Sequence, residues 1–153
     1  MTSTPRPLMI LVAGPYRSGT GDDPARLAAN VRAMNETALA LFRAGHLAVT
    51  GEALALPLIE TAGSARPGDR LFDEIFHPVA ERLLARCDAV LRIGGPSEGA
   101  DRMVAQARAQ GKQVYTSTAD IHAFSSDTGS GEAYPDGVTV ELITQPSQPE
   151  DPS

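Results

Sequence analysis

The feature that most constrains the fold is an uninterrupted apolar run, residues 8–13, that stops at a glycine. A run that is apolar on both faces is typical of a central strand in a parallel sheet, because helices cover such a strand on both sides. After a polar loop, residues 24–44 repeat apolar side chains every three or four positions, the spacing of an amphipathic helix. Asp23 fits the N-cap of this helix, Pro24 its first turn and Gly45 its C-terminal end. The chain therefore opens with a strand, a loop and a helix.

The rest of the core continues this alternation. Pro78 lies inside one expected helix, so we expect that helix to be kinked or restarted there. Alternating elements with short connections predict an α/β fold: a Rossmann-like, open, mainly parallel sheet flanked by helices in three layers. The first two strands should be parallel neighbours. The further strands expected are 46–50, 89–95 and 113–117, and the further helices are 54–61, 70–88 and 100–110.

A chain of 153 residues predicts one domain. We expect that domain to span residues 1–144, with its core at 8–117. Residues 138–144 alternate well enough to form a strand, either at a sheet edge or lent to another subunit. Residues 145–153 contain no aliphatic or aromatic side chain, so they predict a disordered tail.

Composition and charge exclude several functional classes. The net charge of -6 argues against a nucleic-acid or anionic-membrane partner. No apolar run approaches the roughly 20 residues of a membrane helix, and the one near the N-terminus is short for a signal peptide, so we expect a cytoplasmic protein. Cys87 lies in an apolar helical stretch and is expected in the core rather than as a nucleophile. The three histidines have no metal-ligand spacing, so we expect no metal, and we expect no cofactor.

Two strand ends carry the pattern of a ligand-binding loop. Backbone N–H groups in glycine-rich turns, together with the positive end of the following helix, bind anions. Neither loop is a Walker A or a G-x-G-x-x-G motif. Ligands of open α/β sheets bind beyond the carboxyl ends of the strands, so the two loops should converge on one ligand. The residues expected to bind it are Gly14, Tyr16, Arg17, Ser18 and Gly19 in the first loop and Ser97 and Gly99 in the second.

Three ionisable residues near these strand ends are further candidates. Arg92 lies in an otherwise apolar strand, where burial without a partner is costly. It therefore lies at a sheet edge, or it meets a carboxylate or the ligand. Glu52 follows the second strand and fits either an acid/base or sugar-binding role or a helix-start charge. His77 either points toward the space beyond these strand ends, or is a partly exposed residue that precedes Pro78.

The segments "ILVAGPY", "AGH" and "RCDAVLRIGGPSEGADRMVAQARAQGKQVY" together resemble the nucleoside 2-deoxyribosyltransferase superfamily. That superfamily includes nucleoside 5'-monophosphate N-glycosidases and small relatives with a similar "AGP" strand. The resemblance covers about residues 8–117. It implies a Rossmann-like fold, a homodimer or larger assembly whose site a neighbouring subunit helps to build, and a nucleotide or phosphosugar-like ligand.

The resemblance also assigns roles to individual positions. Ser97 and Gly99 match a Ser-x-Gly-x-x-x-Glu element whose serine binds phosphate, and the first loop matches one that contacts sugar or phosphate. The glutamate of that element is the family nucleophile, but Met103 stands in its place, and a second acidic position of the family is Ala80. A thioether cannot form a glycosyl intermediate, so the standard mechanism is not expected here.

Two functions follow from this pattern. The first is binding of a nucleotide or phosphosugar-like ligand in a pocket that lacks the family nucleophile, with Met103 as part of its wall. The alternative is an active N-glycosidase or deoxyribosyltransferase on nucleoside monophosphates. Its carboxylate would be Glu98, Glu52 or Asp101.

Overall fold

Four parallel strands form the middle layer of the protein. The computed structural model describes residues 6–124. Each neighbouring pair of strands is parallel, so the expected pairing of the first two strands and the expected fold class are both confirmed. The strands are β1 (Met9–Ala13), β2 (Leu47–Thr50), β3 (Ala89–Arg92) and β4 (Gln113–Tyr115), in the order β2-β1-β3-β4.

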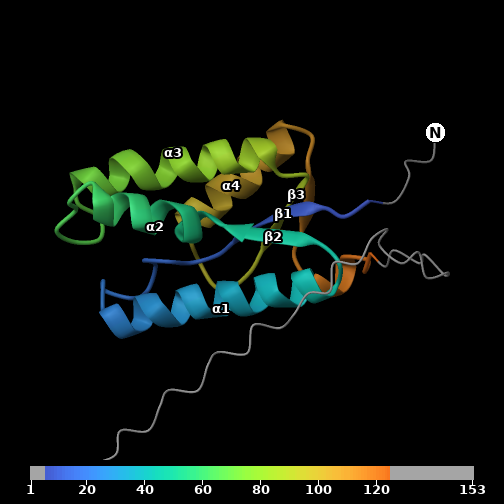
Figure 1. Cartoon of the computed structure of the whole chain (residues 1–153), viewed down its shortest axis with the longest axis horizontal. Helices are drawn as coiled ribbons and strands as arrows, with labels where there is room; N and C mark the ends of the chain where they lie inside the picture. The colour runs from blue at the N-terminus through green and yellow to red at the C-terminus, as the bar shows by residue number, and fades with distance from the viewer. Residues whose placement is uncertain (1–5, 125–153) are drawn as a thin grey trace, which may run out of the picture.

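Helices cover both faces of this sheet (Figure 1). Side chains of α1 pack with Ile10 and Val12 on one face, whereas α3 and α4 pack with Leu11 and Ala13 on the other. The alternation of the first strand between two apolar layers explains why its whole sequence is apolar. The helices are α1 (Pro24–Arg43), α2 (Gly51–Thr61), α3 (Arg70–Arg86) and α4 (Glu98–Ala109), followed by a short 3-10 turn, η1 (Thr118–Asp120). Among the described residues, no helix is long and apolar enough to cross a bilayer.

The helix after β2 begins earlier than the sequence predicts. It starts at Gly51 rather than at residue 54, because the Thr50 hydroxyl accepts the N–H of Ala53 at 3.2 Å and caps the first turn. Helix and strand therefore follow one another without a loop. This early start places Glu52 in the first turn of α2, directly beyond the end of the sheet.

The second half of the core also differs from expectation in detail. Helix α3 continues through Pro78, so of the two expected outcomes, a kink or a restart, the restart does not occur. Strand β3 ends at Arg92 rather than at residue 95, and α4 begins at Glu98 because Ser97 caps it. The predicted strand 138–144 and the predicted tail lie outside the described residues.

The order of the strands creates a crevice at one end of the sheet. Strands β1 and β3 are neighbours, but the chain leaves β1 for α1 on one face and β3 for α4 on the other. Such a switch point is where open α/β sheets bind ligands, beyond the carboxyl ends of the strands. The glycine-bearing loops after β1 and β3 both lie at this point.

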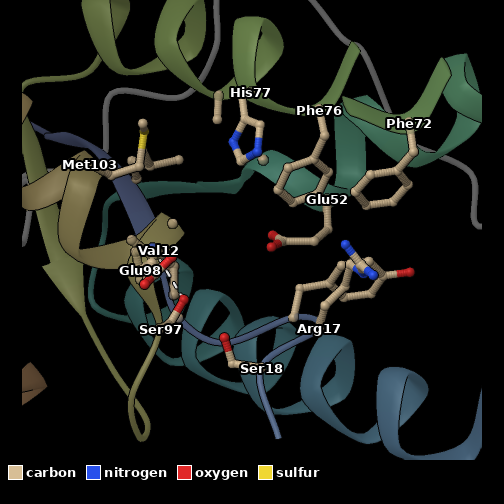
Figure 2. Close-up of a pocket in the computed structure, with 18 of the residues that line it drawn as sticks. Val12, Arg17, Ser18, Glu52, Phe72, Phe76, His77, Ser97, Glu98 and Met103 are labelled. Atoms are coloured by element: carbon tan, nitrogen blue, oxygen red, sulfur yellow. Dashed lines mark hydrogen bonds between the residues drawn. The ribbon is translucent and has the colours of Figure 1, made fainter. Parts of the chain in front are cut away.

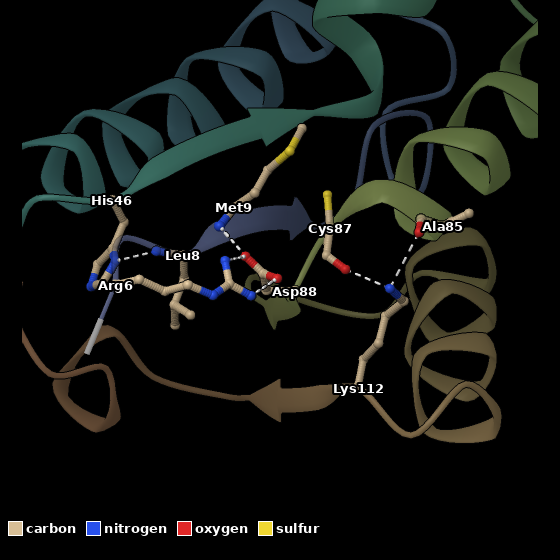
Figure 3. A network of polar contacts seen from close by, with 8 residues as sticks. All are labelled: Arg6, Leu8, Met9, His46, Ala85, Cys87, Asp88 and Lys112. Atoms are coloured by element: carbon tan, nitrogen blue, oxygen red, sulfur yellow. Dashed lines mark hydrogen bonds and ion pairs between the residues drawn. The ribbon is translucent and has the colours of Figure 1, made fainter. Parts of the chain in front are cut away.

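Polar contacts fasten the strands at the opposite end (Figure 3). Asp88 accepts the backbone N–H of Met9 at 2.8 Å and also pairs with Arg6, which holds the pKa of this carboxyl below its usual value. His46 accepts the N–H of Leu8 at 3.0 Å through Nδ1. These contacts join the amino ends of β1, β2 and β3. The glycine-bearing loops lie at the carboxyl ends, where a site can form.

Candidate functional site

A cavity of about 300 Å³ lies at the switch point, between the ends of β1 and β3 and the helices α2, α3 and α4. The two loops that border it touch each other. A Cβ added to Gly14 would lie 3.0 Å from Cγ1 of Ile93, and one added to Gly94 would lie 2.7 Å from Cδ of Pro15. Gly94 has φ +75°, which only glycine adopts without strain. The absence of side chains at these two positions lets the loops pack together.

Most of the residues predicted for the site line this cavity (Figure 2). They come from both loops and from the beginnings of two helices, as the convergence of the strand ends requires. From the first loop they are Gly14, Tyr16, Arg17 and Ser18; from the second loop and α4 they are Ser97, Glu98, Gly99 and Met103; from α2 it is Glu52.

Three candidate residues do not line the cavity. The Nε of Arg92 lies 3.1 Å from Oδ1 of Asp101, and its Nη2 donates to the carbonyl of Gly95 at 2.8 Å. Arg92 therefore pairs with a carboxylate, which was one of the alternatives expected for it. Neither Arg92 nor Asp101 lines the cavity. Gly19 lies in the turn of the first loop with φ +74° and open space around its Cα. Gly19 therefore supplies the left-handed backbone conformation that the turn requires.

Glu52 is a buried carboxylic acid whose side chain points into the cavity (Figure 2). Its exposed fraction is 6%. Burial raises its pKa from 4.5 to about 7, because the ionised form loses hydration, and a backbone N–H at the start of α2 offsets only part of this cost. A group with such a pKa can hold or release a proton near neutral pH, which is the requirement for general acid/base chemistry.

Three aromatic rings form one wall of the cavity. Tyr16, Phe72 and Phe76 stack with centroid separations of 5.0 to 6.1 Å and interplanar angles of 7 to 15°. From spacing alone, Phe72 and Phe76 fall on the apolar side of the helix expected after residue 70, where they would be core residues. The signal available was that Asp73 and His77, each next to a phenylalanine on α3, are polar residues beside the apolar stripe. Both line the same cavity.

Arg17 extends from the first loop to the edge of this aromatic wall. Its Nε and Nη2 donate to the two carboxylate oxygens of Asp22 at 2.8 and 3.0 Å. Its guanidinium carbon lies 5.7 Å from the centroid of Phe72, within the range of a cation–π contact. The hydrogen bond to Asp22 raises the pKa of Arg17 and lowers that of Asp22. The only cationic side chain of the cavity, among the described residues, thus already has an anionic partner.

The start of α4 forms the opposite end of the cavity. The Ser97 hydroxyl accepts the N–H of Ala100 at 3.2 Å, and the side chain is buried. Other N–H groups of this first turn have no helical partner, and the helix dipole adds positive potential there. Glu98 lies in the same turn, and its negative charge would repel an anion bound there. Beside it, Met103 and Ala80 give an apolar wall at the two positions where the resemblance expects carboxylates.

Comparisons with known proteins do not add to this geometry. No protein-family model matches the chain, and no curated protein is significantly similar to it.

Among residues 6–124, no group of three histidine, cysteine or carboxylate side chains could hold a metal ion.

Proposed function

We propose that the protein binds a nucleotide or phosphosugar-like ligand in this cavity, which lacks the nucleophile of the nucleoside 2-deoxyribosyltransferase superfamily. The observation that carries the proposal is that one cavity joins both strand-end loops, an aromatic wall and a helix N-terminus. Aromatic side chains accept a flat heteroaromatic ring, and backbone N–H groups accept a phosphate. The ligand's phosphate would lie at the start of α4 beside Ser97, its sugar above Gly14 and its ring toward Phe72.

A second candidate function is cleavage of an N-glycosidic bond. Glu52 favours it, because burial raises the pKa of this carboxylic acid to about 7. Both its protonated and its ionised forms are therefore present near pH 7. In its protonated form Glu52 would donate a proton to the nitrogen of the departing base. A water would then add to the anomeric carbon and lose a proton, which leaves a free base and a sugar phosphate. Asp101 is the weakest of the three candidate carboxylates, since it pairs with Arg92 outside the cavity. Glu98 lines the cavity and would be the alternative acid.

The experiment that separates the two functions uses 2'-deoxynucleoside 5'-monophosphates. Binding is measured as a rise in melting temperature, and cleavage as free base separated by chromatography. Glu52→Gln keeps the shape of the side chain and removes its proton, and Glu60→Gln on an exposed position of the same helix is the control. Base release that is lost only in Glu52→Gln establishes catalysis. A stabilising shift without base release establishes binding alone. Neither shift nor release with any of the nucleotides would contradict both functions.

We also propose that the protein self-associates and works in the cytoplasm. The large apolar side chains that the described residues leave exposed are Leu39, Phe42, Leu47, Leu54 and Leu58. All five belong to α1, β2 and α2, and β2 packs against both helices. Exposed apolar surface that gathers on neighbouring elements marks interaction sites. The cytoplasmic proposal rests on the cysteine content, since the one cysteine, Cys87, can form no disulfide within the chain.

A further inference from the structure

Arg17 is held in one orientation by three contacts. The Asp22 carboxylate takes the edge formed by Nε and Nη2. The Phe72 ring faces the guanidinium plane. Gly68, with φ +79°, approaches so closely that a Cβ at this position would overlap the guanidinium. A guanidinium has five N–H groups, and Asp22 takes two of them. Among residues 6–124 the Arg17 side chain makes no other hydrogen bond, so the donors on the edge formed by Nη1 and Nη2, beside Gly68, remain available.

The charge of Arg17 is more than compensated by its surroundings. Asp22 is bonded to it, and the charge of Asp73 on α3 also acts on it; together they raise the pKa of the guanidinium. Asp73 lines the cavity as well. An anion bound to Arg17 would lie beside two carboxylates, and the like-charge repulsion would oppose the attraction of one guanidinium. A neutral acceptor meets no such repulsion, because it accepts the same hydrogen bonds without bringing a charge.

We propose that Arg17 recognises the ring of the ligand and not its phosphate, and that Asp22 determines this specificity by neutralising Arg17. The acceptor best matched to the remaining edge is a pair of neighbouring oxygen and nitrogen acceptors on a flat ring, as O6 and N7 of guanine present to arginine. Adenine places a donor where guanine has O6, so it is disfavoured. The phosphate then lies at the start of α4. This inference rests on the proposed function, because it assigns one part of the same ligand.

The test compares 2'-deoxyguanosine, its 5'-monophosphate and 2'-deoxyadenosine by calorimetry. Arg17→Met should weaken both guanine ligands by the same factor, about tenfold, which corresponds to one good bidentate contact. Arg26→Met, an exposed arginine in the first turn of α1, should leave all affinities unchanged. Wild-type protein should prefer deoxyguanosine to deoxyadenosine. A loss in Arg17→Met that is confined to the monophosphate would overturn the inference, since Arg17 would then bind phosphate.

A second pair of variants tests the role of Asp22 without removing Arg17. Asp22 has φ +58°, a conformation that asparagine tolerates, and its neighbour Asp23 is an N-cap, where asparagine serves equally well. Asp22→Asn and Asp23→Asn therefore remove the same charge with little change in backbone. Inorganic phosphate should displace deoxyguanosine from Asp22→Asn, because Arg17 is no longer neutralised, but not from Asp23→Asn or the wild type. Equal displacement from all three proteins would overturn the inference.

The failure of the proposed function gives a different result. In that case the wild-type protein binds none of the three compounds, and no variant can alter their relative affinities. Binding by the wild type with the wrong pattern among the variants contradicts the assignment of Arg17 and Asp22 alone.

Discussion

Glu52 carries a carboxyl group into a place where water cannot fully solvate its charge. Its position follows from a single hydroxyl, because Thr50 caps α2 and lets the helix begin directly at the end of β2. Had the helix begun at residue 54, Glu52 would lie in a connecting loop and its burial would not follow from the fold. The placement of Glu52 therefore depends on one local hydrogen bond between a side chain and the backbone.

The raised pKa of Glu52 predicts that it destabilises the folded protein at high pH. The folded protein keeps this proton up to pH about 7, whereas the unfolded chain releases it near 4.5. Between these values the unfolded state binds fewer protons, so the free energy of unfolding falls as pH rises, by about 3 kcal/mol in total. Glu52→Gln removes this loss. Urea unfolding at pH 5 and pH 8 should show the variant gaining stability relative to the wild type at pH 8. An equal difference at both pH values would show that Glu52 has an ordinary pKa.

At the scale of elements, two of the three helices that border the cavity contain an interior proline. Pro57 lies inside α2 and Pro78 inside α3, and neither ends its helix. Each proline removes one backbone N–H donor and crowds the preceding turn. The packing between α2 and α3 compensates for this local cost, so both helices are maintained by tertiary contacts more than by their own sequences.

We predict that Pro78→Ala stabilises the protein. Alanine restores the hydrogen bond to the preceding turn, and interior proline costs about 3 kcal/mol in a helix. The greater freedom of the unfolded chain offsets up to about 1 kcal/mol of this gain. The expected increase in the free energy of unfolding is therefore about 2 to 3 kcal/mol, measured by urea titration. Pro24→Ala is the control, because the first turn of α1 tolerates proline and should show no gain. A less stable Pro78→Ala would contradict the prediction.

At the scale of the whole molecule, the two edges of the sheet differ in the apolar surface that they leave exposed. The exposed large apolar side chains all lie on α1, β2 and α2, at the β2 edge of the sheet. Tyr16 lies between the cavity and a groove lined by α1 and Leu56. A second copy seated on this surface would therefore lie next to the cavity.

We predict that replacing two of these residues with charges abolishes self-association. The wild type should elute as a dimer or larger species when size-exclusion chromatography is combined with light scattering. The double variant Leu39→Glu, Leu58→Glu should elute as a 16.1 kDa monomer with an unchanged circular dichroism spectrum. Ala105→Glu, an exposed position on α4, is the control and should behave as the wild type. A wild type that is monomeric at every concentration would contradict the prediction.

Much of this site was predictable because its main determinants are local. The apolar run of β1, the cap at Asp23 and the spacing of α1 each involve neighbours in sequence, so strand and helix positions follow from periodicity. The partner of Arg92 was not predictable, because Asp101 reaches it only after β3 and α4 have packed. The stacking of Phe72 on Tyr16 likewise joins residues far apart in the chain.

By itself, the sequence determined the α/β fold and the two glycine-bearing strand ends, since these depend on residue type and spacing. Only the tertiary structure decided that Glu52 is buried, that Arg17 is paired with Asp22 beside Phe72, and that Arg92 faces away from the cavity. The physical reason is that burial and charge balance depend on groups brought together from distant parts of the chain. The spacing of residues along the chain does not specify how far apart they lie in the folded protein.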